Sequence, residues 1–190
     1  MVLNIVLNTS ILISCDKRKP EDERPYLIKV RKFLMDTDEE TLWFVFTDII
    51  NEYKKVPNEI ERCGCSLDSF GHAFLLVLRK LPYIRPGRKL PLSKNTSLVR
   101  TPAGSSERLR ACVSKIFDEL KLEKNDKKFG EIAAAIAKKG EDVWIISLDK
   151  KIYESGAEIS RRIKSECHIK GRLYVTKPSE FIPRMTVSCL

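Results

Sequence analysis

The stretch that decides the fold runs from Gly130 to Lys150 and has the sequence GEIAAAIAKKGEDVWIISLDK. Its alanine-rich first half predicts a helix, the Lys-Lys-Gly triplet predicts the end of that helix, and residues 143 to 147 predict a buried strand. Helices that alternate with strands bury a sheet between helical layers, and ligands bind at the carboxyl ends of such strands. Asp149 follows the strand directly, so we expect a reactive or metal-binding carboxylate there.

A similar unit lies near the N-terminus. The apolar run Leu3 to Leu7 predicts a strand over residues 2 to 7, and the short polar segment Asn8-Thr9-Ser10 follows it. Two predicted strands therefore end in short polar side chains. Because parallel strands end at the same edge of a sheet, we expect these side chains to share one site.

The remaining pattern completes an alternation of helices and strands. Two further strands are predicted at 42–46 and 172–176, and residues 121–128 are interpreted as a polar turn. Helices are predicted at 26–35, 69–81, 106–120 and 152–167, and after Thr47 in the segment DIINEYKKV. The chain of 190 residues is expected to form one domain, a three-layer α/β/α sandwich around a central, mainly parallel sheet.

A basic, proline-containing segment at about 80–105 stands apart from this alternation. No acidic residue occurs between Asp68 and Glu107, and four of the nine prolines lie between Pro82 and Ser106. We interpret it as an exposed loop, either simply solvated or tracking the phosphates of a nucleic acid, with an aromatic ring available to stack on unpaired bases. The candidate nucleic-acid-binding residues are Arg79, Lys80, Tyr83, Arg85, Arg88, Lys89, Lys94 and Arg100.

Composition narrows the class of protein. The chain is 43% hydrophobic and 32% charged, as in globular proteins with a sizeable core, and its net charge of +9 favours a polyanionic partner. No apolar run approaches the roughly 20 residues that span a bilayer, and residues 1–14 lack the basic leader of a signal peptide. We expect a cytoplasmic protein without a membrane partner.

The six cysteines carry no zinc signature. Cys63-Gly64-Cys65 is too closely spaced for a C-x2-C knuckle, and no second pair follows it. Cys167-His168 offers two ligand types, but buried thiols are the preferred interpretation because cysteine behaves as a small hydrophobe. The pattern leaves open whether any of the six form disulfides.

Four pieces of the chain, in this order, resemble the PIN domain (PilT N-terminus) family of small metal-dependent nucleases. They are VLNTSILI, FTDIINEYKKV, GEIAAAIAKKGEDVWIISLD and VTKPSEFI. The first is similar to the family's opening strand and its Asp-Thr-Ser signature, and the second to the helix that presents a glutamate. The third matches an acidic residue, an alanine-rich helix, a strand and a terminal aspartate. The fourth is similar to the closing strand with its Pro-x-x-Phe end.

The resemblance implies a ribonuclease whose carboxylates hold Mg2+ or Mn2+, which would activate water for attack on an RNA phosphodiester. Carried over by position, the catalytic set is Asn8, Glu52, Glu131 and Asp149; the metal ligands are Asn8, Glu52 and Asp149, and the supporting hydroxyls are those of Ser10 and Ser147. It also implies RNA as partner, homodimerisation, and a protein antitoxin or RNA-processing partner.

The chain departs from the family pattern at two positions. Asn8 stands where the family has aspartate, and an amide oxygen ligates a cation without adding negative charge. The alanines align Gly130 with the third acid, which leaves Glu131 one residue and about 100° of helix rotation away. Asp126 and Glu141 are substitutes further from the pattern.

The competing interpretations are therefore an impaired nuclease and a PIN-fold RNA-binding or scaffold protein without catalysis. Structural roles for the same side chains stay open as well. In these, Asn8 bonds the backbone of its turn, Asp149 caps a following helix, and Glu52 is a solvated surface residue.

Overall fold

A computed structural model of the chain describes residues 2–12, 21–45, 53, 55, 69–101 and 106–187. Its centre is a six-stranded sheet in the order β3-β4-β2-β1-β5-β6, and every neighbouring pair is parallel except β3 and β4. The strands are β1 (Leu3–Leu7), β2 (Thr41–Val45), β3 (Lys89–Pro91), β4 (Thr96–Arg100), β5 (Val143–Ile146) and β6 (Leu173–Thr176). The expected α/β fold with a mainly parallel sheet is confirmed.

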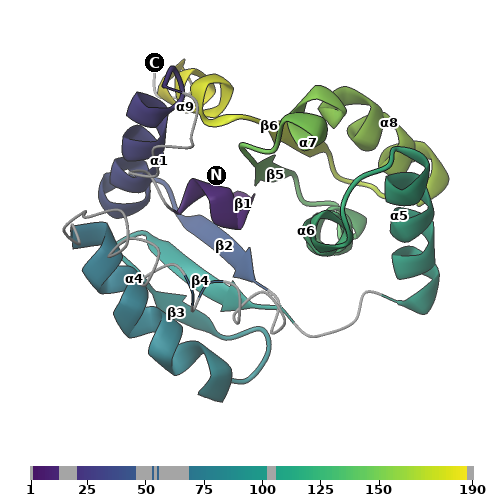
Figure 1. Cartoon of the computed structure of the whole chain (residues 1–190). Coiled ribbons are helices and arrows are strands. Elements are labelled where there is room, and N and C mark those ends of the chain that lie inside the picture. The colour runs from purple at the N-terminus through teal and green to yellow at the C-terminus, as the bar shows by residue number, and fades with distance from the viewer. Residues whose placement is uncertain are drawn as a thin grey trace.

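Helices cover both faces of this sheet (Figure 1). One layer contains α1 (Arg24–Asp36), α4 (Ser69–Lys80) and α9 (Pro178–Val187), and the other contains α5 (Glu107–Glu119), α6 (Lys124–Lys138) and α8 (Gly156–Glu166). Helix α6 packs on the neighbouring strands β1 and β5, and α8 packs on β6. Three short helices are η1 (Thr9–Ile11), η2 (Leu81–Tyr83) and α7 (Lys150–Glu154). The arrangement is a three-layer α/β/α sandwich.

The central strands are buried because helices lie over both their faces. All five residues of β1 are buried, and the one polar member, Asn4, donates from Nδ2 to the carbonyl of Asp142 at 2.9 Å. Between β2 and α4, Trp43 stacks on Phe74 with ring centroids 5.3 Å apart, and within α4 Phe70 stacks on Phe74 at 5.8 Å. These apolar contacts fix α4 against the β2 side of the sheet.

The segment from Pro82 to Ser106, interpreted as an exposed loop, contains two strands of the sheet, so that prediction was wrong for 89–91 and 96–100. β4 pairs along its whole length with β2, and Leu98 at its centre is fully buried. Pro91 lies at the end of the edge strand β3, where the absence of an N–H is tolerated. The sheet therefore has six strands rather than the four expected.

The predicted polar turn at 121–128 is shorter than expected because α6 already begins at Lys124. Asp126 accepts from the backbone N–H of Glu123 at 3.1 Å, and the Glu123 side chain accepts in return from the third residue of the helix. This reciprocal capping box satisfies N–H groups that the first helical turn leaves unpaired. The helix at 106–120 begins as predicted, since the Ser106 hydroxyl accepts from the N–H of Leu109.

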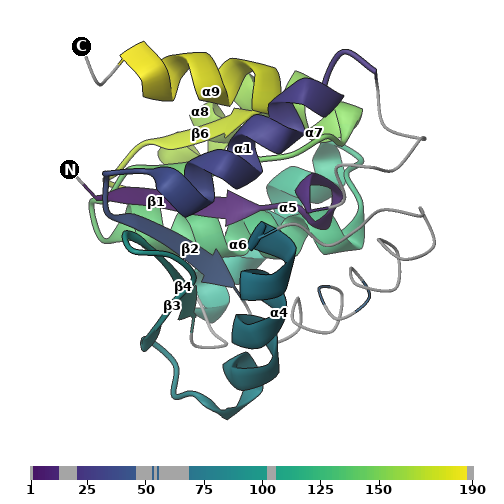
Figure 2. The same cartoon turned by 90° about the vertical axis from the view of Figure 1, so that its left-hand side faces the viewer.

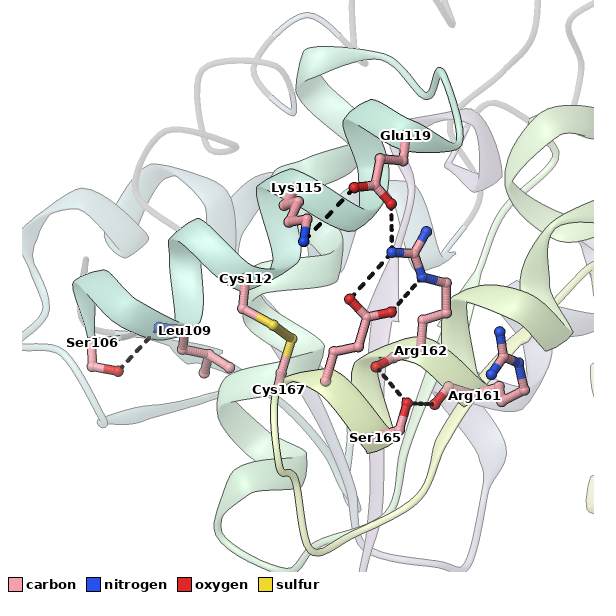
Figure 3. The surroundings of a disulfide bond; sticks show 10 residues. Ser106, Leu109, Cys112, Lys115, Glu119, Arg161, Arg162, Ser165 and Cys167 are labelled. Carbon is pink, nitrogen blue, oxygen red and sulfur yellow. Dashed lines mark hydrogen bonds and ion pairs between the residues drawn. A yellow bond between two sulfur atoms is a disulfide. The ribbon is translucent and has the colours of Figure 1, made fainter.

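Two of the cysteines, interpreted as buried thiols, are joined in a disulfide. Cys112 on α5 and Cys167 at the end of α8 are linked across 55 residues of sequence, with Cα atoms 5.8 Å apart (Figure 3). Beside the bond, the Arg162 guanidinium pairs with Glu119 on α5 and with Glu166 on α8, each at 2.6 Å. The other four cysteines, at positions 15, 63, 65 and 189, lie outside the described residues.

In the part of the chain that the structure describes, no helix has both the length and the apolar character that crossing a bilayer would take.

Candidate functional site

The strand order creates a topological switch point between β1 and β5. From β1 the chain builds outward through β2 to β4, and it then returns to the other side of β1 to form β5 and β6. In open α/β sheets, ligands bind outside the carboxyl ends of the strands at this point, because the two connections leave it in opposite directions. Figure 2 shows β1 and β2 pointing the same way, with η1 directly beyond the end of β1.

The two polar strand ends predicted from the sequence meet at this switch point. The last residues of β1 and β5, Leu7 and Ile146, are register partners, and Asn8 donates its backbone N–H to the Ile146 carbonyl at 3.0 Å. The Ser10 hydroxyl then accepts from the N–H of Leu148 at 3.3 Å and so bridges the two strand ends. The two segments therefore lie at one edge of the sheet, and a common site formed by their side chains stays a prediction.

Asn8 holds its own turn together. Its Oδ1 accepts from the N–H of Ser10 at 3.1 Å, which caps η1. This is the structural role left open by the sequence. An amide oxygen has two lone pairs, so one remains for a further partner such as a cation.

Asp149 also has a structural role. Its Oδ1 accepts from the N–H groups of Lys151 at 2.9 Å and Ile152 at 3.4 Å, which caps α7. The hydroxyl of Ser147, which is fully buried, accepts from the N–H of Asp149 at 3.0 Å. The two hydrogen bonds to Oδ1 therefore fix the direction of this carboxylate, while Oδ2 takes no part in the cap.

Tyr53 is a residue of this edge whose role was not foreseen. Its hydroxyl donates to the Leu7 carbonyl at 2.7 Å, a buried bond that reaches the end of β1 from a segment 46 residues away. The sequence placed Tyr53 only within the helix predicted after Thr47. Glu52, the predicted second acid, precedes it and lies outside the described residues.

The third acid of the family pattern has no counterpart at Gly130. A Cβ atom there would lie 2.5 Å from the Phe117 ring and 3.2 Å from Val113, so this position faces the packed contact with α5. The Glu131 side chain is 15% exposed and forms an ion pair with Nε of Arg110 on α5 at 3.8 Å. Glycine at position 130 therefore allows α6 to pack closely on α5. The nearest acid in sequence, Glu131, is paired with Arg110 of α5.

The two substitute acids have different positions. Asp126 belongs to the capping box at the start of α6. Glu141 precedes β5, so it lies at the amino end of that strand, whereas Asp149 lies beyond the carboxyl end. The suggestion that Glu141 replaces the third acid is wrong, because the length of the strand separates it from the site.

The donor set at the switch point suits a hard cation only in part. The oxygen donors of Asn8, Ser10 and Asp149 are of the type that Mg2+ and Mn2+ prefer, but these three side chains carry a single negative charge. Among the described residues there is no group of three or more His, Cys, Asp or Glu side chains that would hold a metal ion. The described residues alone therefore predict weak metal binding.

The positively charged side chain of Lys177 lies at the same edge, and the sequence interpretation did not single it out. Lys177 directly follows β6. The last residue of that strand, Thr176, accepts at its carbonyl from the N–H of Ser147 at 3.0 Å. The Lys177 ammonium pairs with the buried Glu23 at 3.3 Å, and the hydrogen bond to that carboxylate raises the lysine pKa. The signal available in the sequence was its position, directly after a predicted strand.

The predicted nucleic-acid-binding residues separate into two groups. Around the end of α4 and the carboxyl end of β4, the side chains of Arg79, Lys80, Tyr83, Arg85 and Arg88 are exposed. The other three have different surroundings. Lys89 pairs with Glu40 at 2.5 Å, Lys94 lies in the β3–β4 turn at the amino end of β4, and Arg100 donates to the carbonyls of Pro82 and Ile84. Lys94 is therefore at the opposite edge of the sheet from the exposed group around Tyr83.

The chain was compared with protein-family models, with curated proteins and with solved structures, and none of the three comparisons gave a match.

Proposed function

We propose that this protein is a PIN-like, metal-dependent ribonuclease whose site at the switch point binds its cation weakly. The observation that supports the proposal is the position of Asn8 and Asp149 just beyond two neighbouring strand ends. The hydrogen bond from the Leu148 N–H to the Ser10 hydroxyl joins these ends. These segments are 138 residues apart in sequence and belong to two different motifs of the PIN resemblance. A nuclease site needs oxygen donors that converge, and neighbouring strand ends at one edge of a sheet are a place where such donors can do so.

The protein's contribution to such a reaction is positioning. The cap on α7 fixes the direction of Asp149, and the asparagine turn fixes Oδ1 of Asn8 close to the end of β1. A bound Mg2+ or Mn2+ would supply a water of lowered pKa and would stabilise charge on the phosphate oxygens. Asn8, Glu52 and Asp149 would hold that ion, with Glu52 adding the second negative charge.

The alternative is a PIN-fold RNA-binding or scaffold protein without catalysis. Two observations favour it, namely the neutral amide at position 8 and the use of Asp149 as a helix cap. Both proposals place RNA at the carboxyl edge of the sheet, and they differ in whether a cation binds there.

Titration with Mn2+ by calorimetry distinguishes them, with labelled single-stranded RNA as the cleavage substrate. Asn8→Asp restores a charge at the site and should bind Mn2+ more tightly and cleave faster than the unmodified protein. Asp149→Asn in the Asn8→Asp background should abolish both gains. Glu141→Gln is the matched control, because it removes a carboxylate from the opposite edge and should change neither. If neither the unmodified protein nor Asn8→Asp bound Mn2+, the ribonuclease proposal would be wrong and the binding protein would remain.

A further inference from the structure

Tyr83 is the most exposed large hydrophobic side chain described, with 89% of its surface accessible. It does not lie on a loosely held loop. The first residue of η2, Leu81, is fully buried and anchors the segment in the core, and the N–H of Ile84 donates back to the Leu81 carbonyl at 3.4 Å. The chain therefore orders this turn and still leaves the ring in water.

Arg100, the last residue of β4, holds the turn from the other side. Its Nη1 donates to the carbonyl of Pro82 at 3.0 Å and to the carbonyl of Ile84 at 2.5 Å, the two residues that flank Tyr83. The Arg100 carbonyl accepts from the N–H of Gly87 at 2.6 Å, where a φ of 83° lets the chain turn back toward β3. One arginine thus fixes the backbone on both sides of the exposed ring.

The charged residues nearest to Tyr83 in sequence are cationic. Arg79, Lys80, Arg85 and Arg88 are exposed within five residues of Tyr83, and no acidic residue occurs from position 69 to 106. An isolated exposed aromatic residue is unremarkable. Here the backbone on both sides of the ring is held, and the cationic side chains next to it form no ion pair with another described residue, so the turn offers a stacking face and phosphate-binding groups together.

We infer that Tyr83 is a stacking platform for an unpaired base of single-stranded nucleic acid, with Arg85 and Arg88 binding the flanking phosphates and Arg100 positioning the ring. A base in a duplex has both faces covered by its neighbours, so only an unpaired base stacks on a protein ring. The platform lies beyond the carboxyl end of β4, at the edge of the sheet where Asn8 and Asp149 are found. The inference rests on the proposed function in taking a polynucleotide as the substrate, and it specifies a single-stranded one.

The test measures binding by fluorescence anisotropy with a labelled 12-nucleotide oligouridine and with a duplex RNA of the same length. EDTA is present throughout, so that cleavage does not enter. The unmodified protein should bind the single strand more tightly. Tyr83→Ala should weaken that binding about 5- to 150-fold, the range for loss of one base–aromatic stack, and Tyr83→Phe should retain it.

The salt dependence separates the roles of the arginines. Replacing Arg85 and Arg88 together with glutamine should lower the slope of log K against log salt by about 1.4, or 0.7 for each phosphate contact. Arg100→Gln should weaken binding as Tyr83→Ala does while leaving that slope unchanged, because its guanidinium binds carbonyls rather than phosphates. Thermal unfolding followed by circular dichroism checks that Arg100→Gln remains folded, and Tyr83→Ala tests the platform independently of it.

Equal binding of duplex and single strand, with no effect of Tyr83→Ala, would identify a general polyanion surface and overturn the inference. Cleavage of RNA combined with Tyr83-independent binding would overturn the platform and leave the ribonuclease proposal standing. Tyr83-dependent binding by a protein that neither binds Mn2+ nor cleaves RNA would support the platform and refute the ribonuclease.

Discussion

Breaking the disulfide between Cys112 and Cys167 should lower the free energy of unfolding by about 4 kcal/mol. The bond closes a loop of 55 residues. In the chain-entropy model, the constraint on the unfolded chain is about 2.1 + 1.5R ln 55, or roughly 14 cal/mol/K, which is about 4 kcal/mol at 25 °C. The folded arrangement should persist, because Arg162 still joins α5 to α8 through Glu119 and Glu166.

The assay is equilibrium unfolding in guanidinium chloride of a protein in which the other four cysteines are replaced by serine, so that thiol exchange is excluded. It is measured oxidised, reduced with a phosphine, and as the Cys112→Ala/Cys167→Ala variant. The reduced protein keeps both sulfur atoms, so its loss of stability reports the loop constraint alone, whereas the double variant adds a small packing loss. The denaturant slope should rise in both, since an unbridged unfolded chain is more extended.

Reduced and oxidised proteins that unfold within about 0.5 kcal/mol of each other would refute this reasoning, since the entropic term is several times larger. A loss confined to the alanine variant would mean that packing around the sulfur atoms, rather than the closed loop, provides the stabilisation.

Three further predictions concern the folded core and one ion pair. Gly171→Ala should lower the free energy of unfolding by about 3 kcal/mol, because a Cβ atom there would lie 2.0 Å from the Glu141 carbonyl oxygen. Urea unfolding measures this loss, and a neutral effect would contradict the close approach. Phe74→Ala should cost about 3–5 kcal/mol, since this ring is 2% exposed and stacks on two others; a loss below about 1 kcal/mol would show that the cluster is not tightly packed. Because Glu23 raises the pKa of Lys177 above its ordinary value of 10.5, that ion pair contributes fully below pH 10 and is lost as the pH rises through the raised pKa. The stability difference between Lys177→Met and the unmodified protein should therefore be larger at pH 8 than at pH 11, and an equal difference at both values would exclude a charge effect.

The central strands could be predicted because burial on both faces leaves a continuous apolar run. Residues 143–146 form such a run and residues 3–7 form one interrupted only by Asn4, and the alternation of these strands with helices also indicated the parallel sheet. β4 was missed because only Leu98 and Val99 of its five residues are apolar and prolines flank the segment. Its strand character comes from pairing with β2, a contact that no local pattern records.

The candidate site was predictable at its strand ends and not beyond them. The positions of Asn8 and Asp149 follow from where two apolar runs stop, and the edge that they share follows from parallel pairing. The environment of Gly130 depends instead on the Phe117 ring from a neighbouring helix, which sequence spacing does not report. The disulfide was equally hidden, since its two cysteines are 55 residues apart and belong to no spacing motif.

The edge strand β3 limits how this sheet can grow. It has only three residues, and it begins with a lysine and ends with a proline that offers no N–H to an incoming chain. A second molecule that tried to extend the sheet at this side would find little backbone to pair with. Self-association by strand addition is therefore disfavoured at the β3 edge, which protects the sheet from aggregation. The exposed basic residues around Tyr83 can stay open to solvent without making this side of the sheet prone to pairing.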